Sequence, residues 1–90
     1  MKTVRAKISG QVQGVFFRKF IKDEADKLSL KGHVRNLDSG EVEVVAEGSP
    51  EAVDKMMACC KKGAPHSTIK GVDIQELNHI GFDDFKLLEI

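Results

Sequence analysis

The sequence predicts an α+β fold, in which two amphipathic helices cover one face of a single β-sheet. The first observation is the order of strand-like and helix-like segments, which is β-α-β-β-α-β-β. The second is that both helical segments have one apolar and one polar side, as expected for helices that pack on a sheet. The third is the length of 90 residues, which gives room for one core and therefore for one domain over residues 1–90.

The first strand and the first helix are separated by a loop with two glycines. Residues 2–9 alternate between apolar and polar side chains, which predicts a half-buried strand. Residues 17–28 carry apolar side chains at helical spacing, which predicts an amphipathic helix. We expect the aromatic side chains of Phe16, Phe17 and Phe20 to belong to the core and not to a ligand site.

A β-hairpin follows the first helix. Residues 31–36 form a short alternating segment, and residues 41–47 form another. The turn between them contains Asp38, which can hydrogen-bond the backbone ahead, and Gly40, which can adopt a positive φ. Two alternating segments around such a turn predict paired antiparallel strands.

The second half begins with a clear helix start. Ser49 is suited to be the N-cap and Pro50 the first helical residue, and Gly63 is expected to end the helix in the αL conformation. Residues 68–77 and 82–90 are predicted to be the last two strands. The complete order βαββαβ(β), with both helices on one face of an antiparallel or mixed sheet, predicts a ferredoxin-like α/β sandwich.

The composition is typical of a globular protein and argues against several classes. The chain has 14 Lys+Arg and 14 Asp+Glu, and a net charge of zero argues against a broad nucleic-acid interface. No apolar run approaches the roughly 20 residues that span a bilayer, and the N-terminus does not have the pattern of a signal peptide, so we expect a cytoplasmic protein. Cys59 and Cys60 are adjacent, which suits neither a structural disulfide nor a metal site.

The loop between the first strand and the first helix is a candidate anion site. Gly10 and Gly14 frame it, and Arg18 follows in the first helical turn. Glycines allow backbone N–H groups to curl around a phosphate at a helix N-terminus, and Arg adds a planar charged group. The alternative is an ordinary strand-to-helix connection with a solvated Arg, which the glycine spacing alone favours.

Asn36 ends the second predicted strand and is a candidate for holding a water molecule. In this topology the strand 41–47 lies beside the first strand and the strand 31–36 lies beyond it, so Asn36 could come near the mouth of the first loop. A side-chain amide can orient water without titrating. The alternative is that Asn36 only initiates the turn that follows.

Several other chemistries lack their diagnostic residues. A heavy-metal carrier of this fold would have Cys-x-x-Cys in the first strand–helix loop, which contains no Cys. An RNA-binding member would present aromatic residues on its central strands, and none occurs there. The chain also has no Gly-x4-Gly-Lys-Ser/Thr sequence and no Ser or Cys paired with a His as in a nucleophilic site.

Three segments together resemble the acylphosphatase family. They are Gly-Gln-Val-Gln-Gly-Val-Phe-Phe-Arg at residues 10–18, Gly-His-Val-Arg-Asn at residues 32–36, and Gly-Glu-Val-Glu-Val at residues 40–44. The resemblance extends from about residue 2 to residue 90. It implies hydrolysis of the carboxyl–phosphate bond of acyl phosphates, giving a carboxylate and inorganic phosphate.

The resemblance also implies residue roles. Arg18 would bind the phosphate, and Asn36 would hold the attacking water. The phosphoryl oxygens would be wrapped by the backbone of Gln13, Gly14, Val15, Phe16, Phe17 and Arg18. No metal or other cofactor and no phosphoenzyme are implied, inorganic phosphate would act as product and competitive inhibitor, and we expect a monomer without nucleic-acid or membrane partners.

Two alternatives remain open at the level of sequence. The chain could be a non-catalytic anion- or partner-binding ferredoxin-like module, as acylphosphatase-like domains are inside larger maturation proteins, or a purely structural domain. The sequence also departs from the family pattern at His33, where an aromatic residue is common, and in lacking a terminal aromatic residue. Neither departure affects Arg18 or Asn36.

Overall fold

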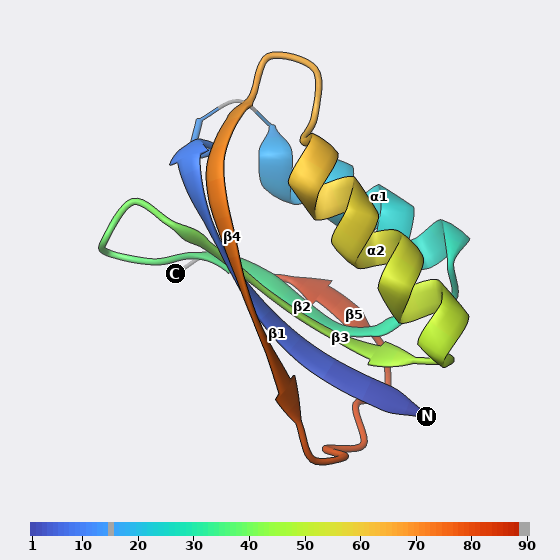
Figure 1. The fold of residues 1–90 in the computed structure, drawn as a ribbon. Coiled ribbons are helices and arrows are strands. Elements are labelled where there is room, and N and C mark those ends of the chain that lie inside the picture. Colours follow the sequence, from blue (N-terminus) through green and yellow to red (C-terminus); the bar gives the residue numbers. More distant parts are fainter. Residues whose placement is uncertain (15, 89–90) are drawn as a thin grey trace.

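The computed structural model describes residues 1–14 and 16–88. These residues form a five-stranded sheet with two helices on one of its faces (Figure 1). The elements are β1 (Lys2–Gln11), α1 (Phe17–Lys27), β2 (Lys31–Asn36), β3 (Val42–Gly48), α2 (Pro50–Lys62), β4 (Thr68–Leu77) and β5 (Phe85–Leu87). Neither helix is long and apolar enough to cross a membrane.

The strand order confirms the ferredoxin-like α+β fold. Along the sheet the order is β4-β1-β3-β2-β5. β1 pairs antiparallel with both β3 and β4, and β2 pairs antiparallel with β3. β2 and β5 are parallel, which makes the sheet mixed. The predicted hairpin and the predicted position of the third strand beside the first are therefore both present.

The core lies between the sheet and the two helices. It is built from the inward side chains of the central strands and one face of each helix, as the alternating and helical patterns predict. From the sheet it includes Val4, Ala6, Ile8, Val34, Val42, Val44 and Ala46. From the helices it includes Phe17, Ile21, Ala25, Val53, Met56, Met57 and Cys60.

The prediction that Phe16 belongs to the core is wrong. Phe17 is 1% exposed and Phe20 packs partly buried against the core, but Phe16 is 84% exposed. Phe16 is the N-cap of α1 and has φ 59 and ψ 22, in the left-handed region. Phe16 precedes the first helical residue, so its side chain does not follow the helical periodicity and does not share the buried face of Phe17.

Two other boundaries differ from the expectation. The last strand was expected over 82–90, but β5 covers only Phe85–Leu87, and residues 89–90 lie outside the described residues. Gly63 ends α2 with φ 84 but ψ 173, which is not the αL conformation. At the start of α2 the prediction is confirmed, because Ser49 Oγ accepts a hydrogen bond from the N–H of Ala52 at 3.2 Å.

The segment before β5 is held by Glu47. This buried carboxylate, on the sheet face opposite the helices, accepts hydrogen bonds from the backbone N–H groups of Ile80, Gly81 and Phe82 at 2.8, 2.9 and 3.1 Å. The Thr3 hydroxyl donates another at 2.5 Å. The hydrogen bond from Ile80 and the others lower the pKa of Glu47 to about 2. The N–H groups of residues 80–82 donate to Glu47 and are therefore not available for hydrogen bonds to a neighbouring strand.

A second buried carboxylate, Glu43, lies on the same open face. Arg5 Nε donates to it at 2.6 Å and Arg35 Nε at 2.8 Å, and His33 Nε2 lies 2.9 Å from its Oε1. Burial alone would raise the pKa of Glu43, but the hydrogen bonds from His33, Arg35 and Arg5 outweigh it and lower the pKa to about 2. Arg35 therefore faces away from Asn36, as its alternation along β2 predicts.

Candidate active site

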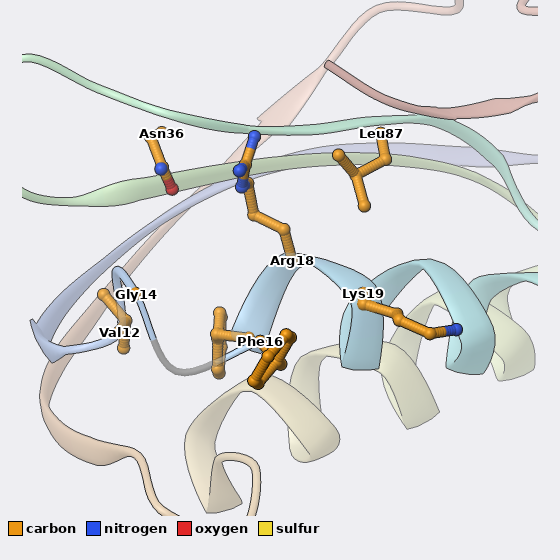
Figure 2. A pocket seen from close by; sticks show the side chains of 8 residues that line it. Val12, Gly14, Phe16, Arg18, Lys19, Asn36 and Leu87 are labelled. Carbon is orange, nitrogen blue, oxygen red and sulfur yellow. The ribbon is translucent and has the colours of Figure 1, made fainter. Parts of the chain in front are cut away.

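The main candidate site is a hollow of about 400 Å³ beside the start of α1 (Figure 2). Three separate parts of the chain contribute to it: the loop and first helical turn, the end of β2, and β5. The lining residues are Val12, Gly14, Phe16, Phe17, Arg18, Lys19, Asn36 and Leu87. The topology therefore brings the two predicted motifs together at one end of the sheet.

The end of β1, which leads into this hollow, is irregular at Gly10. The register between β1 and β4 shifts between Ser9 and Gly10, which is typical of a β-bulge. A side chain at Gly10 would lie 1.9 Å from the carbonyl oxygen of Thr68, so only glycine allows this approach. Gly14 has φ 75 but open space around it, so it is needed for its backbone conformation and not for room.

The N-terminus of α1 is open. No side chain of the described residues caps it at Phe16, and the first turn contains no acidic residue. The first intrahelical hydrogen bond runs from Phe20 N–H to Phe16 C=O at 3.1 Å, so the preceding N–H groups have no partner within the helix. α2, by contrast, is capped by Ser49 and has Glu51 in its first turn. Open N–H groups and the helix dipole favour an anion at α1.

Arg18 extends from the first turn of α1 toward the strand that carries Asn36 (Figure 2). Its Nη1 donates a hydrogen bond to the carbonyl oxygen of Leu88 at 2.6 Å, which holds the guanidinium beside the hollow. The permanent positive charge of Arg adds to the field of the open helix terminus. The site is therefore suited to an anion.

Asn36 supplies a buried acceptor to the same hollow. It shares a face of β2 with Val34, toward the helices, and it pairs with Val42 in the register with β3. Its Oδ1 is buried and has no hydrogen-bond partner in the described part of the chain. A buried acceptor without a partner costs about 1–3 kcal/mol, so a water or ligand donor is expected to occupy this position.

The predicted site residues are placed as follows. Gly14, Phe16, Phe17, Arg18 and Asn36 all line the hollow. The Gln13 side chain instead donates to the hairpin turn, with hydrogen bonds to the carbonyl oxygens of Leu37 and Glu41. Val15 lies outside the described residues.

Three lining residues were not predicted from sequence. Lys19 follows Arg18 in the open first turn of α1, so its position could have been inferred from the helix start. Val12 belongs to the loop after β1. Leu87 arrives through the parallel pairing of β5 with β2, which no local pattern indicates.

The remaining reactive side chains are separate from this hollow. Cys59 and Cys60 are free thiols on α2, and burial raises the pKa of Cys60 to about 12. Within residues 1–14 and 16–88, no group of three His, Cys, Asp or Glu side chains is arranged as a metal site.

Comparison with known proteins identifies the family. The family model for acylphosphatase matches residues 4–87. The chain belongs to the acylphosphatase family. An acylphosphatase from Methylococcus capsulatus is 43% identical over 89 residues, covering 98% of this chain and 97% of that relative.

Solved structures give the same family. The crystal structure of an acylphosphatase from Bacillus subtilis has a TM-score of 0.94 and 37% identity, covering 99% of this chain and all of that one. Full-length HypF, crystallised in a phosphate- and nucleotide-bound form, has a TM-score of 0.84 and 32% identity, covering 98% of this chain but 12% of its own. Similarity to acylphosphatases over nearly the whole of both chains supports acylphosphatase function and does not favour a non-catalytic module.

Proposed function

We propose that this acylphosphatase hydrolyses the carboxyl–phosphate bond of an acyl phosphate in the hollow between the first turn of α1 and the end of β2. The observation that carries the proposal is one juxtaposition. The open N-terminus of α1, with Arg18, lines the same hollow as the buried, unpartnered Oδ1 of Asn36. The first feature suits an anion, and the second suits a water molecule.

In this proposal the phosphoryl group is held without covalent bonds to the protein. The backbone N–H groups of residues 13–18 wrap its oxygens, and the Arg18 guanidinium binds it from the other side. Donors that are held in place before the substrate arrives stabilise the charge that develops on the phosphoryl oxygens without reorganising. Phosphoryl transfer needs little more than such positioning and charge stabilisation.

Asn36 is proposed to orient the water that attacks phosphorus. Its Oδ1 accepts a hydrogen bond from the water, whose oxygen forms the new bond to phosphorus as the bond to the acyl oxygen breaks. The acyl group leaves as a carboxylate, which is a good leaving group. Because an amide is a poor base, a phosphoryl oxygen takes the proton of the water, and inorganic phosphate is released.

We also propose that the protein acts as one domain, as a monomer, in the cytoplasm, and without a metal ion. Light scattering at micromolar concentration tests the oligomeric state. Hydrolysis of benzoyl phosphate in the presence of a chelator tests the metal requirement. Full activity is expected in the chelator, because backbone N–H groups and Arg18 supply the positive field of the proposed site.

The residue roles are tested by steady-state hydrolysis of benzoyl phosphate. Asn36→Ala is expected to lower kcat about 10²–10³-fold, with inhibition by inorganic phosphate nearly unchanged, because only the water is lost. Arg18→Ala is expected to raise KM and the phosphate inhibition constant and to lower kcat. Arg35→Ala is the matched control, because this neighbouring arginine binds Glu43 on the opposite face of the sheet.

The outcomes separate the candidates clearly. Competitive inhibition by phosphate in the active wild type supports a shared site for substrate and product. A wild type that binds phosphate but hydrolyses nothing would instead support the binding module. A fully active Asn36→Ala variant would remove its role in orienting water.

A further inference from the structure

Gln13 connects two parts of the molecule through its side chain. Its Nε2 donates one hydrogen bond to the carbonyl oxygen of Leu37 and one to that of Glu41, each at 3.0 Å. A primary amide has two N–H protons, and these two bonds use both. The Gln13 backbone lies next to Gly14, which lines the hollow, whereas Gln13 is not among the described residues that line it.

The turn that receives these bonds directly follows Asn36. It is already closed by its own hydrogen bonds, from Leu37 N–H to Glu41 C=O at 2.8 Å and from Gly40 N–H to Leu37 C=O at 3.1 Å. Each carbonyl oxygen therefore has a partner before Gln13 adds a second. The bonds from Gln13 are not required to satisfy the turn, and their specific effect is to join the turn to the loop.

We propose that Gln13 is a positioning residue that fixes the phosphate cradle relative to Asn36. This inference rests on the proposed function, because it assumes that the cradle holds the phosphoryl group and that Asn36 orients the water. The two groups come from segments more than twenty residues apart in sequence. In-line attack requires the water and the phosphorus at a defined separation, and a displacement of about 1 Å can cost about 10²-fold in rate.

The position of the bonds makes the coupling direct. Leu37 is bonded to Asn36 in the chain, so restraining its carbonyl group restrains the end of β2. Glu41 is adjacent to Val42, which is the register partner of Asn36 on β3. Gln13 thus holds both strands of the hairpin at the end where Asn36 lies, and its own backbone belongs to the proposed cradle.

The test is a double-mutant cycle between Gln13→Ala and Asn36→Ala, measured with benzoyl phosphate. Gln13→Ala alone is expected to lower kcat roughly 10- to 100-fold, with the inhibition constant of inorganic phosphate changed less than about three-fold. In the Asn36→Ala background, Gln13→Ala is expected to lower kcat no further, because the water it helps to place is already lost. Gln75→Ala, at an exposed glutamine on β4, is the matched control.

A purely structural role for Gln13 would give a different result. It would lower Tm with kcat unchanged or lowered equally in both backgrounds, and this would overturn the proposal. We expect the Tm of Gln13→Ala to stay within about 5 °C of wild type, since only two exposed hydrogen bonds are lost. A parallel rise in the phosphate inhibition constant would also overturn it, because Gln13 would then act on the anion.

A spectroscopic measurement keeps the proposal separate from the proposed function. In a ¹H–¹⁵N spectrum of the phosphate-bound protein, the side-chain amide of Asn36 should shift in Gln13→Ala and not in Gln75→Ala. An unchanged Asn36 signal would overturn the positioning role even in an active enzyme. An inactive wild type in which this signal still shifts would refute the proposed hydrolysis and retain the mechanical coupling between Gln13 and Asn36.

Discussion

At the scale of single residues, Phe16 combines two unfavourable features at the entrance of the candidate site. Its backbone has φ 59, a conformation that side chains with a Cβ rarely adopt, and its ring is 84% exposed. Strain of this kind costs about 1–3 kcal/mol and is concentrated at functional sites. Phe16 is the residue at which the chain passes from the loop into α1, and it lines the hollow.

Replacement of Phe16 by glycine should stabilise the protein. Glycine adopts the left-handed conformation without strain, and the exposed ring contributes little packing, so Phe16→Gly should raise the free energy of unfolding by about 1 kcal/mol. Urea unfolding followed by circular dichroism measures this change. Phe16→Ala keeps the strained Cβ and should give no comparable gain. A Phe16→Gly variant less stable than wild type would show that the ring makes packing contacts that its exposure does not suggest.

Single residues are also where sequence patterns are least informative. Helical spacing cannot distinguish the residue before a helix from the first buried residue within it, so Phe16 and Phe17 look alike in the sequence. The side chain of Gln13 could not be placed either, because its partners are backbone carbonyls of a turn more than twenty residues away. Arg18 and Asn36 were predicted from distinctive motifs and both line the hollow, while their roles stay predictions.

At the scale of elements, the two helices have N-termini of opposite kinds. The side chain of Ser49 caps α2, Pro50 is its first residue, and Glu51 lies in its first turn. These local residues stabilise the N-terminus of α2. α1 begins without a side-chain cap among the described residues. Of the two helices as described, α1 contributes lining residues to the candidate site, and it lacks the side-chain cap and the first-turn acidic residue that α2 has.

The cap of α2 should therefore affect stability alone. Ser49→Ala removes the acceptor for the Ala52 N–H and should lower the free energy of unfolding by about 1 kcal/mol. The kcat and KM for benzoyl phosphate should not change. Ser49→Asp keeps a capping oxygen and should retain most of the stability, and a loss as large as that of alanine would exclude capping as the cause.

Element boundaries could be predicted where local chemistry determines them. β2 and β4 have the predicted limits of 31–36 and 68–77, because alternation and turn residues define both ends. β5 begins later than predicted, and the predicted first residue of this strand, Phe82, donates its N–H to Glu47, which is a tertiary interaction. The parallel pairing of β5 with β2 is also a tertiary interaction, which local sequence patterns do not indicate.

At the scale of the whole molecule, the sheet separates a positively charged site on one face from two buried carboxylates on the other. The helix side carries the uncapped terminus and Arg18, and the opposite face carries Glu43 and Glu47 within networks of donors. Both glutamates have a pKa lowered to about 2, from an ordinary value of 4.5. A lowered pKa in the folded state means that the unfolded chain binds these protons more readily.

Stability should consequently fall in acid. The contribution of Glu43 and Glu47 is fully present above about pH 4.5 and is lost as the pH falls from about 4.5 to about 2. Glu47→Gln should reduce the slope of unfolding free energy against pH in this range. Denaturant unfolding at several pH values measures it, with Glu76→Gln on β4 as a control for lost charge. An unchanged slope in Glu47→Gln would contradict the assignment.

The interior position of β1, between β4 and β3 in the sheet, has a consequence for how the protein is made. β1 is synthesised first, yet its partners are β3 and β4, and β4 ends at Leu77. The edge of β1 toward β3 can pair once β3 has been made, but its edge toward β4 stays unpaired until most of the chain has left the ribosome. Pairing of segments so distant in sequence slows folding relative to a helical bundle of similar size. A chain that is interrupted before β4 would contain the whole sequence of the proposed cradle. It would lack the strand with which Gly10, at the end of β1, pairs.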